Sequence, residues 1–190
     1  MEYLSLFSMP TPMKITGRSS SITNAFINSI IPVVHPTVDE VKNALDLLGM
    51  TPKTFQCAYC GGIASEWDHL RPLMKNKKPT GFISEIHNLV PSCGKCNQSK
   101  GNKEWKTWML SIARLSPTGR GIADIAGRIK RLDDYDKSKA PTKMDFEAIV
   151  GNTVWAQHLD NLERVQALMR ESRALAAQIN RDVEIAYRAV

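Results

Sequence analysis

Two short stretches decide the fold of this chain: CAYC at residues 57–60 and CGKC at residues 93–96. The two-residue spacing inside each pair lets both thiolates bind one tetrahedral metal ion. Four sulfur ligands close the coordination shell, so such an ion has a structural role and no open position for chemistry. The chain has no other cysteine, and the pattern favours structural Zn²⁺ over disulfides or a redox motif. The expected zinc ligands are Cys57, Cys60, Cys93 and Cys96.

The composition around these stretches is that of a globular protein. Of the 190 residues, 43% are hydrophobic and 23% are charged, which excludes wholesale disorder and fibrous repeats. No apolar run reaches the roughly 18 to 20 residues that span a bilayer, and residues 1–14 lack the basic region that opens a signal peptide. We therefore expect a cytoplasmic protein without a membrane partner.

The net charge of +6 is local. Residues 70–106 carry eight basic and two acidic side chains, whereas the rest of the chain has 17 of each. A local positive charge predicts a nucleic-acid partner, with a solvated loop as the plainer alternative. The side chains expected to contact DNA are Arg71, Lys75, Lys77, Lys78, Lys95 and Lys103.

The segments outside the cysteine pairs follow helical patterns, whereas the segment between them does not. Residues 54–91 contain short β-branched and aromatic runs bounded by Gly and Pro, which predicts two strands joined by a long connection. Thr37 is expected to cap a short helix that ends at Gly49, and Asn102 is expected to cap one that buries Trp105 and Trp108. Residues 1–36 are expected to form an arm with little regular structure beyond a turn near residues 24–31.

The last thirty residues predict a long helix with one apolar seam. Its members recur with three- and four-residue spacing. The seam either packs on its own domain or forms a homodimer through the C-terminal helix, and the sequence leaves both open. Its residues are Leu162, Val165, Met169, Ser172, Ala176, Ile179, Val183 and Ala186.

The residues between the cysteine pairs and just after them carry a family resemblance. Asp68-His69 comes first, then the sequence HNLVP at residues 87–91, then Asn97 directly after the last cysteine. In this order and frame they resemble the HNH, or ββα-metal, nucleases that are braced by two CxxC pairs, and the resemblance covers about residues 55–108. It implies an α+β fold in which a ββα-metal core with a four-cysteine zinc site is flanked by N-terminal and C-terminal helical segments.

We expect three parts of the chain. Residues 1–50 would form an N-terminal arm and short helix, residues 51–110 the zinc-braced nuclease core, and residues 111–190 a helical region suited to dimerisation. Restriction enzymes, including type II enzymes, and phage or mobile-element nucleases share such a core with helical additions.

The residues of the motif fit the chemistry of phosphodiester hydrolysis. This reaction needs a general base for water and a divalent cation for the phosphate and the leaving oxygen. His69 is the expected general base, because a neutral imidazole has an ordinary pKa near neutral pH. Asp68 and Asn97 are expected to bind the catalytic cation, and oxygen ligands suit Mg²⁺ or Mn²⁺. Adjacent strand residues point to opposite faces, so Asp68 and His69 can share one phosphate only if the strand ends there, as Pro72 indicates.

Two further catalytic roles follow from the resemblance alone. Asn88 would brace, through its side-chain amide, the loop that presents His69. Lys100, about one helical turn after Asn97, would face the phosphate, with a solvated surface lysine as the alternative.

The function expected is therefore that of a metal-dependent DNA endonuclease with a one-metal HNH mechanism, of the restriction type or from a phage or mobile element. A non-catalytic, zinc-dependent nucleic-acid-binding module would keep the cysteines and the basic segment, but it would make the co-occurrence of Asp68, His69, Asn88 and Asn97 accidental. An RNA-cleaving nuclease would share the active-site chemistry and stays open.

Overall fold

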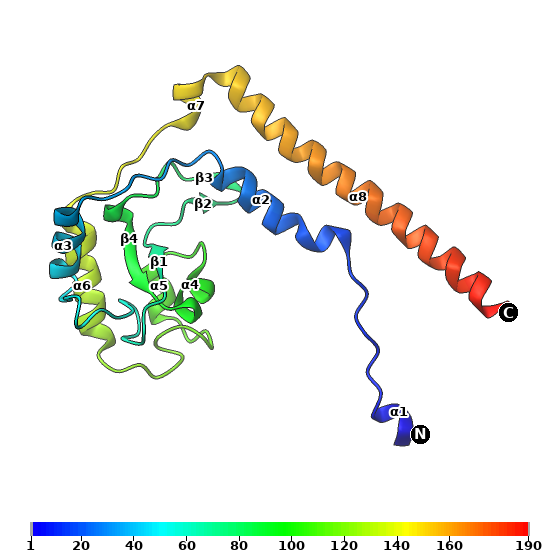
Figure 1. The fold of residues 1–190 in the computed structure, drawn as a ribbon, viewed down its shortest axis with the longest axis horizontal. Helices are drawn as coiled ribbons and strands as arrows, with labels where there is room; N and C mark the ends of the chain where they lie inside the picture. Colours follow the sequence, from blue (N-terminus) through cyan, green and yellow to red (C-terminus); the bar gives the residue numbers. More distant parts are fainter. Residues whose placement is uncertain (1, 190) are drawn as a thin grey trace. The chain divides into compact units, whose positions relative to one another are not determined.

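The computed structural model describes residues 2–189 (Figure 1). Its internal contacts form two units. The central unit is Ile27–Ile149, and the terminal unit combines the described parts of Met1–Phe26 and Val150–Val190. The boundaries expected at residues 50 and 110 both fall inside the central unit, because helices on either side of the cysteine frame share its core.

The heart of the central unit is a two-stranded sheet followed by a helix. Strand β1 (Glu66–His69) pairs antiparallel with β4 (Leu89–Ser92), and helix α4 (Gly94–Lys100) follows directly. The long connection holds a second hairpin of β2 (Met74–Lys75) and β3 (Lys78–Pro79), and a 3-10 turn η2 (Ile86–Asn88). This arrangement confirms the predicted ββα core.

Three helices complete the main core. Thr37 caps helix α3 (Val38–Leu47), as predicted, and forms a capping box with Glu40. Helix α6 (Ile125–Ser138) packs beside α3 (Figure 1). Helix α5 (Trp105–Leu110) buries both of its tryptophans. Its cap is Glu104 and not Asn102, because the Glu104 carboxylate accepts from the backbone N–H groups of residues 106 and 107 while Asn102 lies in the preceding turn.

A second, smaller core ties residues 27–34 to the connection between β1 and β4. Ile27, Ile31, Leu73 and Ile83 form its buried centre. Helix α2 (Ser19–Asn28) ends within the start of this segment and is longer than the single turn expected near residues 24–31. Apolar side chains at 27 and 31, one helical turn apart, bury against the connection and stabilise structure that the Ser/Thr/Pro-rich composition did not predict.

The terminal unit is built on α8 (Asn152–Arg188), the long C-terminal helix that the sequence predicts. A 3-10 turn η1 (Ile15–Arg18) and α2 run antiparallel along its first half (Figure 1), where Gln166 donates to Thr23 at 2.7 Å. The short helices α1 (Glu2–Ser5) and α7 (Phe146–Val150) are the remaining elements. None of the described helices is long and apolar enough to span a membrane.

Candidate active site and metal centre

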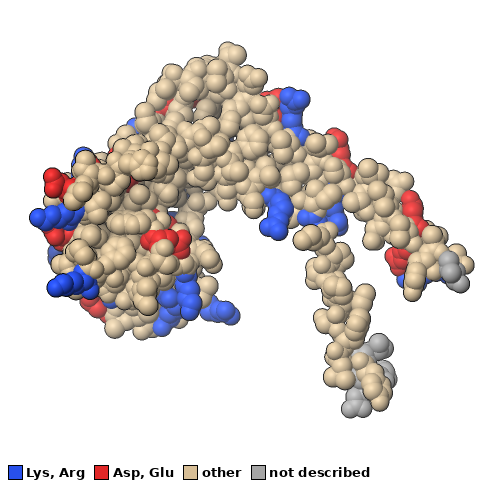
Figure 2. Space-filling view, viewed as in Figure 1, with Lys and Arg blue, Asp and Glu red and all other residues tan. Residues whose placement is uncertain are grey.

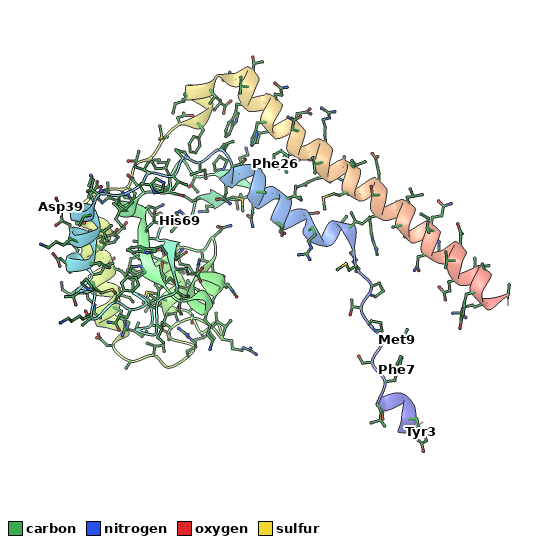
Figure 3. The ribbon with its side chains drawn as sticks, in the orientation of Figure 1. Tyr3, Phe7, Met9, Phe26, Asp39 and His69 are labelled. Carbon is green, nitrogen blue, oxygen red and sulfur yellow. The ribbon has the colours of Figure 1, made fainter. Side chains whose placement is uncertain are left out.

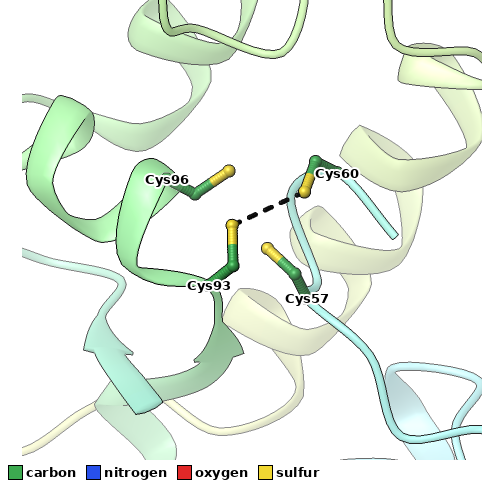
Figure 4. Close-up of side chains that lie close together, drawn as sticks. All are labelled: Cys57, Cys60, Cys93 and Cys96. Atoms are coloured by element: carbon green, nitrogen blue, oxygen red, sulfur yellow. Dashed lines mark hydrogen bonds between the residues drawn. The ribbon is translucent and has the colours of Figure 1, made fainter. Parts of the chain in front are cut away.

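Four cysteine side chains converge between a loop and the start of α4 (Figure 4). Their sulfur atoms all lie within 4.8 Å of one another, and those of Cys60 and Cys93 are 3.7 Å apart. The loop can turn this tightly because Gly61 adopts a positive φ of 73°. The four cysteines are therefore placed to bind one metal ion, as the spacing predicts.

The electrostatics of this cluster fit a cation. Hydrogen bonding to the sulfur atoms of Cys57 and Cys60 raises the pKa of the Cys96 thiol, and burial and repulsion between the crowded thiolates raise it further. Arg120 donates to the Cys96 sulfur at 3.1 Å and supplies positive charge from outside the cysteine frame. A divalent ion held by these four cysteines would let all four thiols ionise, and four thiolates are the donor set of a closed tetrahedral site.

Asp68 lies in β1 and is almost completely buried, with 4% of its surface exposed. Its Oδ2 atom accepts a hydrogen bond from the Tyr59 hydroxyl at 2.5 Å and lies 3.0 Å from Nζ of Lys100. Burial raises the pKa of the Asp68 carboxyl, and the Lys100 ammonium opposes that shift. Neither Tyr59 nor Lys100 uses Oδ1, the carboxylate oxygen that remains for a cation.

His69 is the last residue of β1, and Figure 3 shows it at the heart of the central unit. Its Nε2 atom lies 2.8 Å from the Ser84 hydroxyl oxygen. Burial, and then the nearby Lys100 cation, lower the pKa of His69 to about 4. The imidazole is therefore neutral at pH 7, the state that a general base requires.

Asn97 lies on α4 opposite β1. Its Nδ2 atom donates to Glu66 at 2.9 Å, so the amide oxygen is the atom that could bind a cation. Asp68, His69 and Asn97 line one small cavity of about 130 Å³, beside Pro72. Strand β1 ends at His69, and Asp68 and His69 both line this cavity although they are adjacent in the sequence.

Asn88 is fully buried and joins the two sides of the connection. Its Oδ1 accepts from the backbone N–H of Arg71 at 2.9 Å, and its Nδ2 donates to the Arg71 carbonyl at 3.1 Å. Its own carbonyl accepts from the Leu70 N–H at 2.8 Å. These bonds hold the backbone directly after His69.

Known proteins are similar to this part of the chain. The HNH endonuclease family model matches residues 57–103. The CRISPR-associated endonuclease Cas9 of Corynebacterium diphtheriae is 42% identical over 136 residues, which cover 65% of this chain. The chain spans about 12% of the length of that relative. No solved structure matches the chain.

The chain carries an HNH endonuclease domain. The matched residues contain both cysteine pairs, β1, β4 and α4, so the family match and the ββα core coincide. The site described above is the candidate catalytic centre of this domain.

Lys100 differs from the expectation for the HNH domain. Its side chain is fully buried, whereas a phosphate contact or a solvated lysine would be exposed. Its Nζ donates to the His69 carbonyl at 2.6 Å and pairs with Asp68 at 3.0 Å. The difference arises because α4 packs directly on β1, so the Lys100 ammonium meets Asp68 and the His69 carbonyl in place of solvent.

The basic side chains expected to contact DNA differ in their surroundings. The Arg71 guanidinium is paired with Asp136 at 3.0 and 2.7 Å, so its charge is largely compensated. The others are exposed, and Figure 2 shows Lys and Arg side chains at several places on the surface of this unit with acidic side chains between them. The exposed members are Lys75, Lys77 and Lys78 on the β2–β3 hairpin, Lys95 on α4 and Lys103 after it.

The structure adds three polar residues that sequence reasoning missed. Tyr59 donates a hydrogen bond to Asp68, and Glu66 accepts one from Asn97. Ser84 contacts His69. The sequence offered a signal for Tyr59, because this polar residue lies between Cys57 and Cys60, the two cysteines of the first pair. Ser84 had none, since it lies 15 residues after His69 in an irregular connection.

Proposed function

We propose that the HNH domain is a metal-dependent DNA endonuclease that hydrolyses phosphodiester bonds with His69 as general base. The observation that carries this proposal is that Asp68, His69 and Asn97 line one cavity, although 27 residues separate the last two. A non-catalytic zinc module would give no reason for a buried carboxylate, a neutral imidazole and an amide at one site.

The residues of this site divide the work. His69, held neutral by burial, takes the proton from the attacking water. Asp68 and Asn97 would hold Mg²⁺ or Mn²⁺ through oxygen atoms, which suit hard cations. When bound, that ion would neutralise charge on the phosphate and the leaving oxygen. Lys100 and Asn88 act from behind the site, through Asp68 and the Arg71 backbone respectively.

The cysteine site has a separate role in the proposal. Four thiolates favour Zn²⁺, and a closed shell stabilises the fold without taking part in hydrolysis. This ion would hold the start of α4, and so Asn97, against the loop that precedes β1.

Nucleic acid would lie along the exposed lysines next to the cavity. A second pocket of about 280 Å³ adjoins the first, since Pro72 and Asn102 line both, and Lys75 lines the second. Lys75, Lys77 and Lys78 sit on a two-residue hairpin whose turn residues both have positive φ, a rigid support for phosphate contacts.

The helical segments around the HNH core bear on the kind of nuclease this is. A restriction-type, phage or mobile-element nuclease would suit an HNH core with helical additions, and an enzyme that cuts both strands of a palindrome would be a homodimer. In α8 the seam residues Ile179 and Val183 are 53% and 61% exposed, beyond the part that packs on η1 and α2. Light scattering of the wild type and of the Ile179→Glu/Val183→Glu variant tests this; a wild-type monomer would refute the homodimer.

Cleavage of supercoiled plasmid tests the function itself. Purified wild type and His69→Ala would be compared with Mg²⁺, with Mn²⁺ and with EDTA, while zinc content is measured. We expect cutting by the wild type only with a divalent ion, and an inert His69→Ala that still holds about one zinc per chain. Binding without cutting under every metal would favour the binding module, and cleavage of an RNA substrate in place of DNA would favour a ribonuclease.

A further inference from the structure

We propose that Ser84 is a positioning residue that fixes the tautomer and the orientation of His69. In this proposal the Ser84 hydroxyl, which lies 2.8 Å from Nε2 of His69, accepts a hydrogen bond from Nε2–H, so Nδ1 carries the lone pair that receives the proton from water. This inference rests on the proposed function, in which His69 is the general base.

The contact joins one imidazole nitrogen to one hydroxyl oxygen. Nε2 of His69 and Oγ of Ser84 are 2.8 Å apart, a normal hydrogen-bond distance. A neutral imidazole has one N–H and one lone pair, and the partner of one nitrogen decides which atom carries the proton. If the hydroxyl accepts from Nε2, Nδ1 is the basic nitrogen. The reverse direction would place the proton on Nδ1 and remove the base.

The Ser84 hydroxyl can orient the His69 ring because hydrogen bonds hold both the N–H and the carbonyl of the Ser84 backbone. The Ser84 N–H donates to the Pro32 carbonyl at 3.2 Å, and the Ser84 carbonyl accepts from the Val34 N–H at 2.8 Å. The preceding residue, Ile83, is 5% exposed in the second core, and its carbonyl accepts from Asn88 at 3.4 Å. Backbone pairing and side-chain burial therefore fix the place of Oγ.

This arrangement draws a new segment into the active site. Residues 27–34 lie before the part of the chain that the HNH family model matches, which begins at residue 57. They contact Ser84 through Pro32 and Val34 and support it through the second core. The segment thus supports Ser84 from outside the matched residues, and its own Asn28 lines the cavity of Asp68, His69 and Asn97 directly.

Three variants test the role through kinetics: Ser84→Ala, Ser84→Thr, and Ser65→Ala as a matched control at an exposed serine outside the site. We expect Ser84→Ala to lower kcat on the order of ten- to hundredfold with little change in KM, because a misoriented base is inefficient. Ser84→Thr keeps the hydroxyl and should restore most of kcat, and Ser65→Ala should match the wild type. A kcat of Ser84→Ala within twofold of the wild type would overturn the proposal.

A spectroscopic test does not depend on cleavage. Nitrogen-15 NMR of histidine-labelled protein at pH 7.5 distinguishes the two tautomers of each imidazole, and the His69→Ala spectrum assigns the His69 signals. We expect Nε2–H in the wild type and in Ser84→Thr, and a mixture of tautomers in Ser84→Ala. An Nδ1–H tautomer in the wild type would overturn the proposal even if Ser84→Ala failed to fold. If the wild type shows Nε2–H but cuts nothing, the proposed function fails while the contact with Ser84 stands.

Discussion

The two candidate metal sites of the HNH domain are built in opposite ways. The cysteine cluster uses four identical ligands from two pairs, and its sulfur atoms come within 4.8 Å of one another. The catalytic cavity uses three different side chains, and each is held by a neighbour that does not line the cavity: Tyr59, Ser84 or Glu66. A closed site needs only its ligands to converge, whereas an open site needs each ligand to present one particular atom.

The largest expected effect comes from breaking the closed site. Cys96→Ala removes one ligand at the first turn of α4 and should abolish zinc binding. Structural zinc contributes about 10–16 kcal/mol in small zinc domains, so cooperative thermal unfolding of the central unit should be lost. Circular dichroism melts and metal analysis check this. His69→Ala is the control, because it should retain both the zinc and the melt. A folded Cys96→Ala would contradict a structural role for the cluster.

The next effect comes from the buried ion pair beneath the open site. Lys100→Met leaves the Asp68 carboxylate buried without its cation and should lower the free energy of unfolding by about 3–5 kcal/mol. Denaturant titration of zinc-loaded protein measures the loss. Lys103→Met is the matched control, since Lys103 is exposed and lies three residues later. Equal stability of the two variants would show that the pair with Asp68 contributes nothing to the fold.

Tyr59 connects the two regions, because it lies between Cys57 and Cys60 and its hydroxyl donates a hydrogen bond to Asp68 at 2.5 Å. Burial raises the pKa of the Tyr59 hydroxyl, so it stays a donor at any working pH. Tyr59→Phe should weaken Mn²⁺ binding on the order of tenfold and destabilise the fold by about 1.5–3 kcal/mol, while zinc content stays constant. Calorimetric Mn²⁺ titration checks the first point. Unchanged Mn²⁺ affinity would mean that the two regions are independent.

The contrast also explains what the sequence could predict. Cysteine spacing alone identifies the closed site, because two residues between ligands place both thiolates near one metal whatever the rest of the chain does. Asp68, His69 and Asn97 could be selected by motif order and by the end of the strand before Pro72. Each of these features is a short run of neighbouring residues, so the sequence alone is enough to recognise it.

The residues that hold the open site could not be predicted in the same way. Lys100 lies on α4, and only the packing of α4 on β1 directs it to Asp68, 32 residues earlier. Ser84 and the segment of residues 32–34 meet through tertiary pairing between distant parts of the chain. Such contacts depend on the assembled core, and neither periodicity nor composition carries them.

The smallest expected effect is an absence of pH dependence. Burial and the Lys100 cation lower the pKa of His69 to about 4, and the base is active when unprotonated. The value of kcat/KM, which reports the free enzyme, should therefore stay level from pH 7 to pH 5.5 at saturating Mg²⁺. An unperturbed histidine with a pKa of about 6.5 would lose about tenfold over this range. Zinc content must be followed at each pH, because proton competition for thiolates releases the metal from the closed site as pH falls. A tenfold fall in kcat/KM with zinc still bound would show that His69 is not held neutral by its surroundings. A fall that follows zinc loss would instead show that the acid sensitivity of the domain arises at the cysteine site and not at His69.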